Sequence, residues 1–157
     1  MIRFELNLTG HGWVECVISN GERGATVTAS FLTDAIGEFV SVVQSLPTAS
    51  AGTCDFAEEP GCYRWHFERD GDKVRIAVRW NDEQSSNWHL RFECECGLID
   101  FVRAVDSALA RNLEELGEQG YQQLWGYRFP KEAHERLKHC ILALQRNVIA
   151  TDASPKP

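Results

Sequence analysis

The chain has 157 residues, with 16 lysines and arginines against 23 aspartates and glutamates, so its formal net charge is −7. This length fits one domain, and a hydrophobic share of 43% is typical of a globular protein rather than a disordered one. Phosphate groups repel an acidic protein, so the composition argues against non-specific binding to nucleic acid.

The N-terminal third predicts three antiparallel strands and then a helix. Apolar and polar residues alternate in three stretches separated by glycine-containing turns: residues 2–8, 13–18 and 25–31. The apolar spacing then becomes helical over residues 36–46. Thr33 or Asp34 can cap the start of this helix, and Pro47 marks its end.

The middle of the chain predicts four further strands, at residues 54–56, 63–67, 74–80 and 88–96. A two-residue turn at Asp70-Gly71 is the strongest hairpin signal and places Trp65 opposite Ile76. Two ion pairs then join the last two strands, Arg75 with Glu93 and Lys73 with Glu95. In this interpretation Trp88 and Leu90 point into the core.

The last third predicts two helices. An apolar stripe runs over residues 98–116, and an aromatic connector follows over residues 121–129, in which we expect Trp125 and Tyr127 to be partly exposed. Pro130 suits the first turn of the final helix.

Together these elements predict an α+β fold, with a mainly antiparallel sheet of about six or seven strands and helices packed on one face. We expect residues 1–150 to form a single domain and residues 151–157 a disordered C-terminal tail. No amphipathic helix is left over to cover the polar side of the sheet, so that side should face water.

The cysteines and the N-terminus indicate a compartment. The first residues alternate instead of forming the apolar run of a signal peptide, and no stretch is long enough to cross a membrane. We therefore expect a cytoplasmic protein with reduced thiols. Cys94 and Cys96 lie on one side of a strand, and Cys54 and Cys62 would be needed to complete a four-sulfur site. Because Cys-x2–4-Cys pairs are missing, we expect core thiols, no metal and no cofactor.

Catalytic motifs are also missing. There is no phosphate-binding loop and no Gly-x-Ser-x-Gly elbow. His134 and His139 are five positions apart, about 140° around a helix, and cannot hold one ion together. A hydrolase using His66 or His89 would need an acid within hydrogen-bonding reach of the imidazole.

Two acidic loops connect strands in the middle of the chain. Their side chains are the candidate partner-binding residues: Glu58, Glu59, Asp82 and Glu83. Acidic clusters of this kind steer the association of a basic protein. The alternative is an ordinary solubilising surface.

Several short segments within residues 4–130 resemble a bacterial immunity-protein family. They are an early strand pair containing a tryptophan, the helix entry Leu32-Thr33-Asp34, the turn Phe56-Ala57-Glu58-Glu59-Pro60-Gly61 leading into Tyr63-Arg64-Trp65, and Tyr121, Trp125 and Phe129-Pro130. Members of this family, such as the WapI type, neutralise the C-terminal toxin domains of polymorphic and contact-dependent toxins. The resemblance implies a non-catalytic antidote that binds one toxin.

We therefore expect an immunity-type protein, not an enzyme, that binds a cognate and cationic toxin domain through an acidic surface. It would use no cofactor and bind neither nucleic acid nor membrane. Two alternatives stay open. One is a small-molecule-binding regulatory module, with its pocket between sheet and helices or under the aromatic connector. The other is an unrecognised hydrolase.

Overall fold

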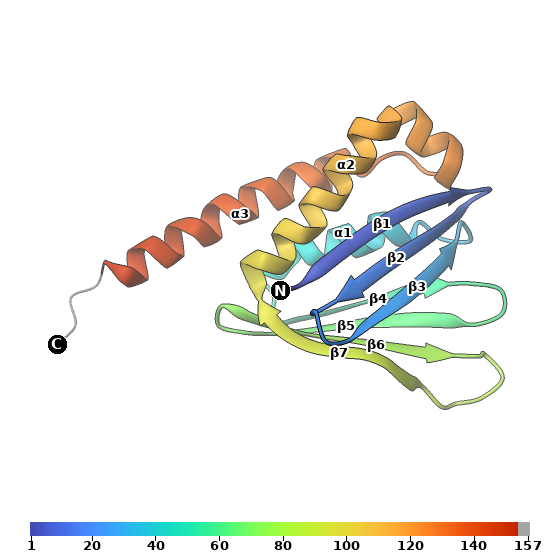
Figure 1. Ribbon diagram of the computed structural model, residues 1–157, viewed down its shortest axis with the longest axis horizontal. Helices are drawn as coiled ribbons and strands as arrows, with labels where there is room; N and C mark the ends of the chain where they lie inside the picture. The colour runs from blue at the N-terminus through green and yellow to red at the C-terminus, as the bar shows by residue number, and fades with distance from the viewer. Residues whose placement is uncertain (154–157) are drawn as a thin grey trace.

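The computed structural model describes residues 1–153, which form an α+β fold with two antiparallel sheets and three helices (Figure 1). The first sheet has the order β1-β2-β3, with β1 at Arg3–Gly10, β2 at Trp13–Ser19 and β3 at Gly24–Ser30. The second has the order β4-β5-β6-β7, with β4 at Ala51–Ala57, β5 at Cys62–Asp70, β6 at Lys73–Asn81 and β7 at His89–Gly97. The fold class is confirmed, but the expectation of one continuous sheet is wrong.

The second sheet is a meander whose register differs from the expected one. Gly71 and the residue after it form the turn, so that Asp70 pairs with Lys73 and Trp65 lies opposite Val78. A shift of two residues leaves every side chain on its original side of the sheet, because the side-chain period is two. Both expected ion pairs form as diagonal neighbours, Lys73 with Glu95 at 3.2 Å and Arg75 with Glu93 at 3.1 Å.

Helix α1 (Ala35–Ser45) joins the two sheets through one aromatic side chain. The ring of Phe39 stacks on Phe4 of β1 at a centroid distance of 5.1 Å and meets Trp65 of β5 edge-on at 4.9 Å. It also contacts Phe56 and Phe67 of the second sheet, both at 5.9 Å. All five rings are buried. The apolar faces of the two sheets are therefore covered by α1 and by each other.

Helix α2 (Leu98–Trp125) packs along β1 and changes direction at Gly117, whose φ of 67° and ψ of 171° are not helical. The segment from Tyr121 to Trp125, expected as a connector, is the last part of this helix. Trp125 is fully buried rather than partly exposed, because its indole N–H donates to Asp34 at 3.0 Å. Tyr127 is half-buried, as expected.

Helix α3 (Lys131–Asp152) closes the fold against α1 and α2. His134 lies 2.9 Å from Asp106 of α2 and is buried, as is Leu137. The tail expected over residues 151–157 falls outside the described residues from position 154 onward, whereas Thr151 and Asp152 belong to α3. None of the helices in residues 1–153 has the length and apolar character needed to cross a membrane.

We predict that Phe39→Ala destabilises the protein by about 3–5 kcal/mol, because the cavity would remove the ring that contacts both sheets. Urea unfolding followed by circular dichroism measures this change in the free energy of unfolding. Ser41→Ala, on the exposed side of the same helix, should change it by less than about 0.5 kcal/mol. Equal effects of the two substitutions would contradict a central role for Phe39.

Candidate functional site

Loops from both sheets gather at one end of the molecule, on the right of Figure 1, and we call this surface the loop end. It comprises residues 10–12, 31–34, 58–61 and 82–88. In an antiparallel meander alternate connections lie at the same end, which brings the β4–β5 and β6–β7 loops together. The first sheet joins them through Ser30, whose hydroxyl donates to the Ala57 carbonyl at 3.4 Å.

The two predicted acids of the β4–β5 loop have different environments. Glu58 is half-buried and accepts hydrogen bonds from the Thr28 hydroxyl of β3 and, at 3.0 Å, from the Trp80 indole N–H of β6. It therefore connects the two sheets and is not free to bind a partner. Glu59 is exposed, and its carboxylate has no hydrogen-bond or ion-pair partner among residues 1–153.

The β6–β7 loop shows the same division between its two acids. The half-buried Asp82 carboxylate accepts from the backbone N–H groups of Gln84 at 3.0 Å and Ser85 at 2.9 Å, so it shapes its own loop. Glu83 is exposed, and within the described part of the chain its carboxylate is unpaired. The structure thus brings all four predicted acids to one end, and leaves Glu59 and Glu83 free.

Two apolar residues of this surface were missed by the sequence analysis. The alternation predicts Phe31 as an inward strand residue, but β3 ends at the buried Ser30, and Phe31 and Leu32 are 54% and 52% exposed. Tyr127 donates to the Phe31 carbonyl at 2.7 Å. The Phe31 ring lies over Gly12, where any side chain would overlap it. Phe31 is therefore held in place by two other segments of the chain.

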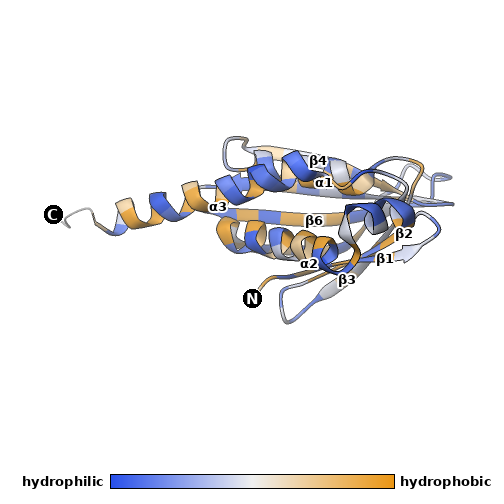
Figure 2. Cartoon of the chain, turned by 90° about the horizontal axis from the view of Figure 1, so that it is seen from above, coloured by the Kyte–Doolittle hydropathy of each residue, from blue (hydrophilic) through white to orange (hydrophobic). Residues whose placement is uncertain are grey.

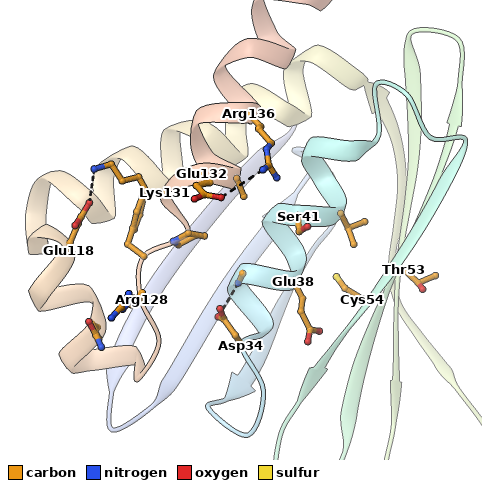
Figure 3. Close-up of a pocket in the computed structure, with 16 residues that line it drawn as sticks. Asp34, Glu38, Ser41, Thr53, Cys54, Glu118, Arg128, Lys131, Glu132 and Arg136 are labelled. Carbon is orange, nitrogen blue, oxygen red and sulfur yellow. Dashed lines mark hydrogen bonds and ion pairs between the residues drawn. The ribbon is translucent and has the colours of Figure 1, made fainter.

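A groove of about 1040 Å³ lies beside the loop end, between α1 and the start of α3 (Figure 3). Its charged side chains carry both signs and largely pair with each other. Lys131 lies 3.6 Å from Glu118, and Arg136 lies 3.8 Å from Glu132. Arg128 is the one lining cation without a carboxylate partner in residues 1–153. Because these charges largely cancel, the groove has little net charge with which to select a charged ligand.

The outer side of the second sheet differs from the expected pattern at Trp88 and Leu90. A bulge between Val78 and Arg79 changes the register with β7, so Leu90 faces outward and is 52% exposed. Trp88 is half-buried, and the Arg64 guanidinium lies over its ring at 4.5 Å. The expectation that both residues fill the core is wrong, because the bulge reverses the side of the strand that each presents.

The two histidines considered for catalysis lack acidic partners in the described residues. His66 and His89 form neither an ion pair nor a hydrogen bond with a carboxylate of residues 1–153. Burial, together with the positive charges of Arg79 and Arg64, lowers the pKa of His66, so the imidazole is neutral at pH 7. His89 lies against the Trp80 ring at a centroid distance of 6.5 Å.

The four thiols considered as a possible metal site do not come together into one cluster in residues 1–153. Cys54 and Cys94 are buried in the core, and Cys62 and Cys96 are half-buried. Burial raises the pKa of Cys62 to about 11, so its thiol is protonated at neutral pH. Across residues 1–153, no three cysteine, histidine or acidic side chains converge closely enough to hold a metal ion.

Comparisons with protein-family models, with curated proteins and with solved structures found no match to this chain.

We predict that Glu58→Gln destabilises the protein by about 1–2 kcal/mol, because an amide offers only one acceptor oxygen to the two donors that Glu58 serves. Chemical denaturation gives the change in the free energy of unfolding. The matched control is Glu59→Gln, which should be nearly neutral because that carboxylate is free. A neutral result for Glu58→Gln would mean that the carboxylate does not hold the sheets together.

We predict that Arg79→Gln raises the pKa of His66, because it removes one of the charges that, after burial, disfavour the imidazolium. Since the folded state binds this proton only at lower pH than the unfolded chain, stability falls as the solution is acidified through the usual histidine range. Arg79→Gln should reduce this loss of stability at low pH. An NMR titration of the His66 ring measures the change in its pKa. Arg75→Gln, which removes a charge paired with Glu93, should leave the pKa of His66 unchanged.

Proposed function

We propose that this protein binds and neutralises a cationic toxin domain, as an immunity-type inhibitor, with the loop end as its binding surface. The class of partner rests on the resemblance of residues 4–130 to bacterial immunity proteins. The choice of surface rests on the composition of the loop end, and no catalytic step is involved.

The observation that carries the proposal is an exposed apolar pair at the same end of the molecule as two free carboxylates. Phe31 and Leu32 follow directly after Ser30, which is bonded to Ala57, and Glu59 lies two residues beyond Ala57. An apolar anchor with a charged rim is the usual composition of a protein–protein interface. Phe31 and Leu32 are each more than half exposed, so a partner that covers them would remove apolar surface from water, which favours binding.

The charge distribution supports a basic partner. The chain carries a net charge of −7, and Glu59 and Glu83 add unpaired negative charge at the surface itself. Such charges increase the rate at which a cationic protein finds this end. Their effect on the dissociation rate is expected to be small, because both lie at the solvent-exposed edge.

Rigidity of the surface favours tight binding. Glu58 joins β3 to β6, and Asp34 both caps α1 and accepts from the Trp125 indole of α2. These carboxylates hold the loops in place before a partner arrives, so little conformational entropy is lost on association.

We predict that the double variant Phe31→Ala, Leu32→Ala weakens toxin binding about 30-fold or more, because it removes the apolar anchor. The probes are purified C-terminal toxin domains of the polymorphic-toxin class that the proposal names, with affinity and rates measured by surface plasmon resonance. Unchanged affinity in this variant would exclude the loop end as the centre of the interface.

The charge-reversal variant Glu59→Lys, Glu83→Lys should slow association and reduce its dependence on salt concentration. The matched control is Glu22→Lys, Asp72→Lys, which reverses two exposed acids in turns at the opposite end of the strands. Both variants change the net charge equally, so a similar loss of association rate in both would contradict a local role for the loop end.

A further inference from the structure

Helix α3 is held by its first half and extends beyond the body with its second half. His134 and Leu137 are buried, and the Cys140 thiol donates to the Gln44 carbonyl of α1 at 3.2 Å. From Arg146 to Asp152 every side chain is exposed, and the helix continues past the ends of the sheets (Figure 2).

This part of α3 nevertheless carries apolar residues on its exposed side. Leu142 is 52% exposed and Ile149 69% exposed, and they lie two helical turns apart on one face. We call the face that contains them the α3 stripe, which consists of Lys138, Leu142, Gln145, Ile149 and Asp152. These positions recur at alternating intervals of four and three residues, the spacing with which two helices pack side by side.

We propose that the α3 stripe binds the same stripe of a second copy, with the two helices antiparallel and the two-fold axis at Gln145. A two-fold interface must be complementary to itself. Centred on Gln145, this arrangement places Lys138 beside the partner's Asp152 and Asp152 beside the partner's Lys138. It also brings Leu142 to within one residue, about 1.5 Å along the helix, of the level of the partner's Ile149, the other exposed apolar residue of the stripe.

The charges of the α3 stripe favour a second copy of the chain as its partner. Lys138 and Asp152 are both exposed, and neither has an ion-pair partner within residues 1–153. They lie about 21 Å apart along one helix, so they cannot pair within one chain. A parallel pair of helices would place Lys138 beside Lys138 and Asp152 beside Asp152, which is repulsive. Only the antiparallel arrangement pairs a lysine with an aspartate at both ends of the α3 stripe.

The dimer is independent of the proposed function and compatible with it. The C-terminal end of α3 and the loop end lie at opposite ends of the molecule (Figure 1). Association through α3 would therefore leave both loop ends free and pointing away from each other. Because the stripe is short, we expect association that depends strongly on concentration.

Sedimentation equilibrium of the purified chain tests the dimer. The apparent mass of the wild type should rise from 17.8 kDa towards twice that value as the concentration increases. Lys138→Asp and Asp152→Lys should each weaken association about tenfold, because each turns both attractive contacts into repulsive ones. The double variant Lys138→Asp, Asp152→Lys should restore association, since it exchanges the charges across the interface.

Three results would overturn the proposal: a wild type that stays monomeric at millimolar concentration, a double variant that does not recover, or single variants that associate like the wild type. Arg146→Glu is the control, because this exposed arginine lies off the stripe and should not affect association. Leu142→Glu with Ile149→Glu should give a monomer whose circular dichroism spectrum stays helical, and a persistent dimer in that variant would place the contact elsewhere. Toxin binding is read separately through the loop-end variants.

Discussion

The packing of Phe39 between the two sheets is the contact on which the rest of the structure depends. Each sheet has one apolar face, and neither can bury that face alone. Phe39 stacks on Phe4 in one sheet and meets Trp65 in the other, so α1 acts as the shared centre of the core. Because loops from both sheets form the loop end, this contact also sets the relative positions of the residues proposed to bind a partner.

Carboxylates of the loop end divide into those that build it and those that remain available. Glu58 and Asp34 each accept from a tryptophan indole and from a second donor, so their charge is used inside the fold. Glu59 and Glu83 have no such partners among residues 1–153. A sequence shows all four as acids in or before turns. The difference lies in which donors the folded chain brings near them.

Much of the secondary structure was predictable because it depends on neighbours in the sequence. Alternating apolar residues indicated the seven strands, and helical spacing indicated α1 and the main part of α2. The Arg75–Glu93 and Lys73–Glu95 pairs were also anticipated, since a two-residue register error preserves both the side of the sheet and the reach of long side chains. The fold class follows from these local patterns.

The sequence by itself determined which residues are apolar, where strands and helices form, and that acids gather in two loops. Only the tertiary structure decided that the strands divide into two sheets, because a pattern shows which side is buried but not what covers it. It likewise placed Leu90 outside through a bulge and Trp125 inside through a bond to Asp34. The exposure of Phe31 was likewise decided by the tertiary structure. These features depend on contacts between residues far apart in the chain, which local periodicity does not encode.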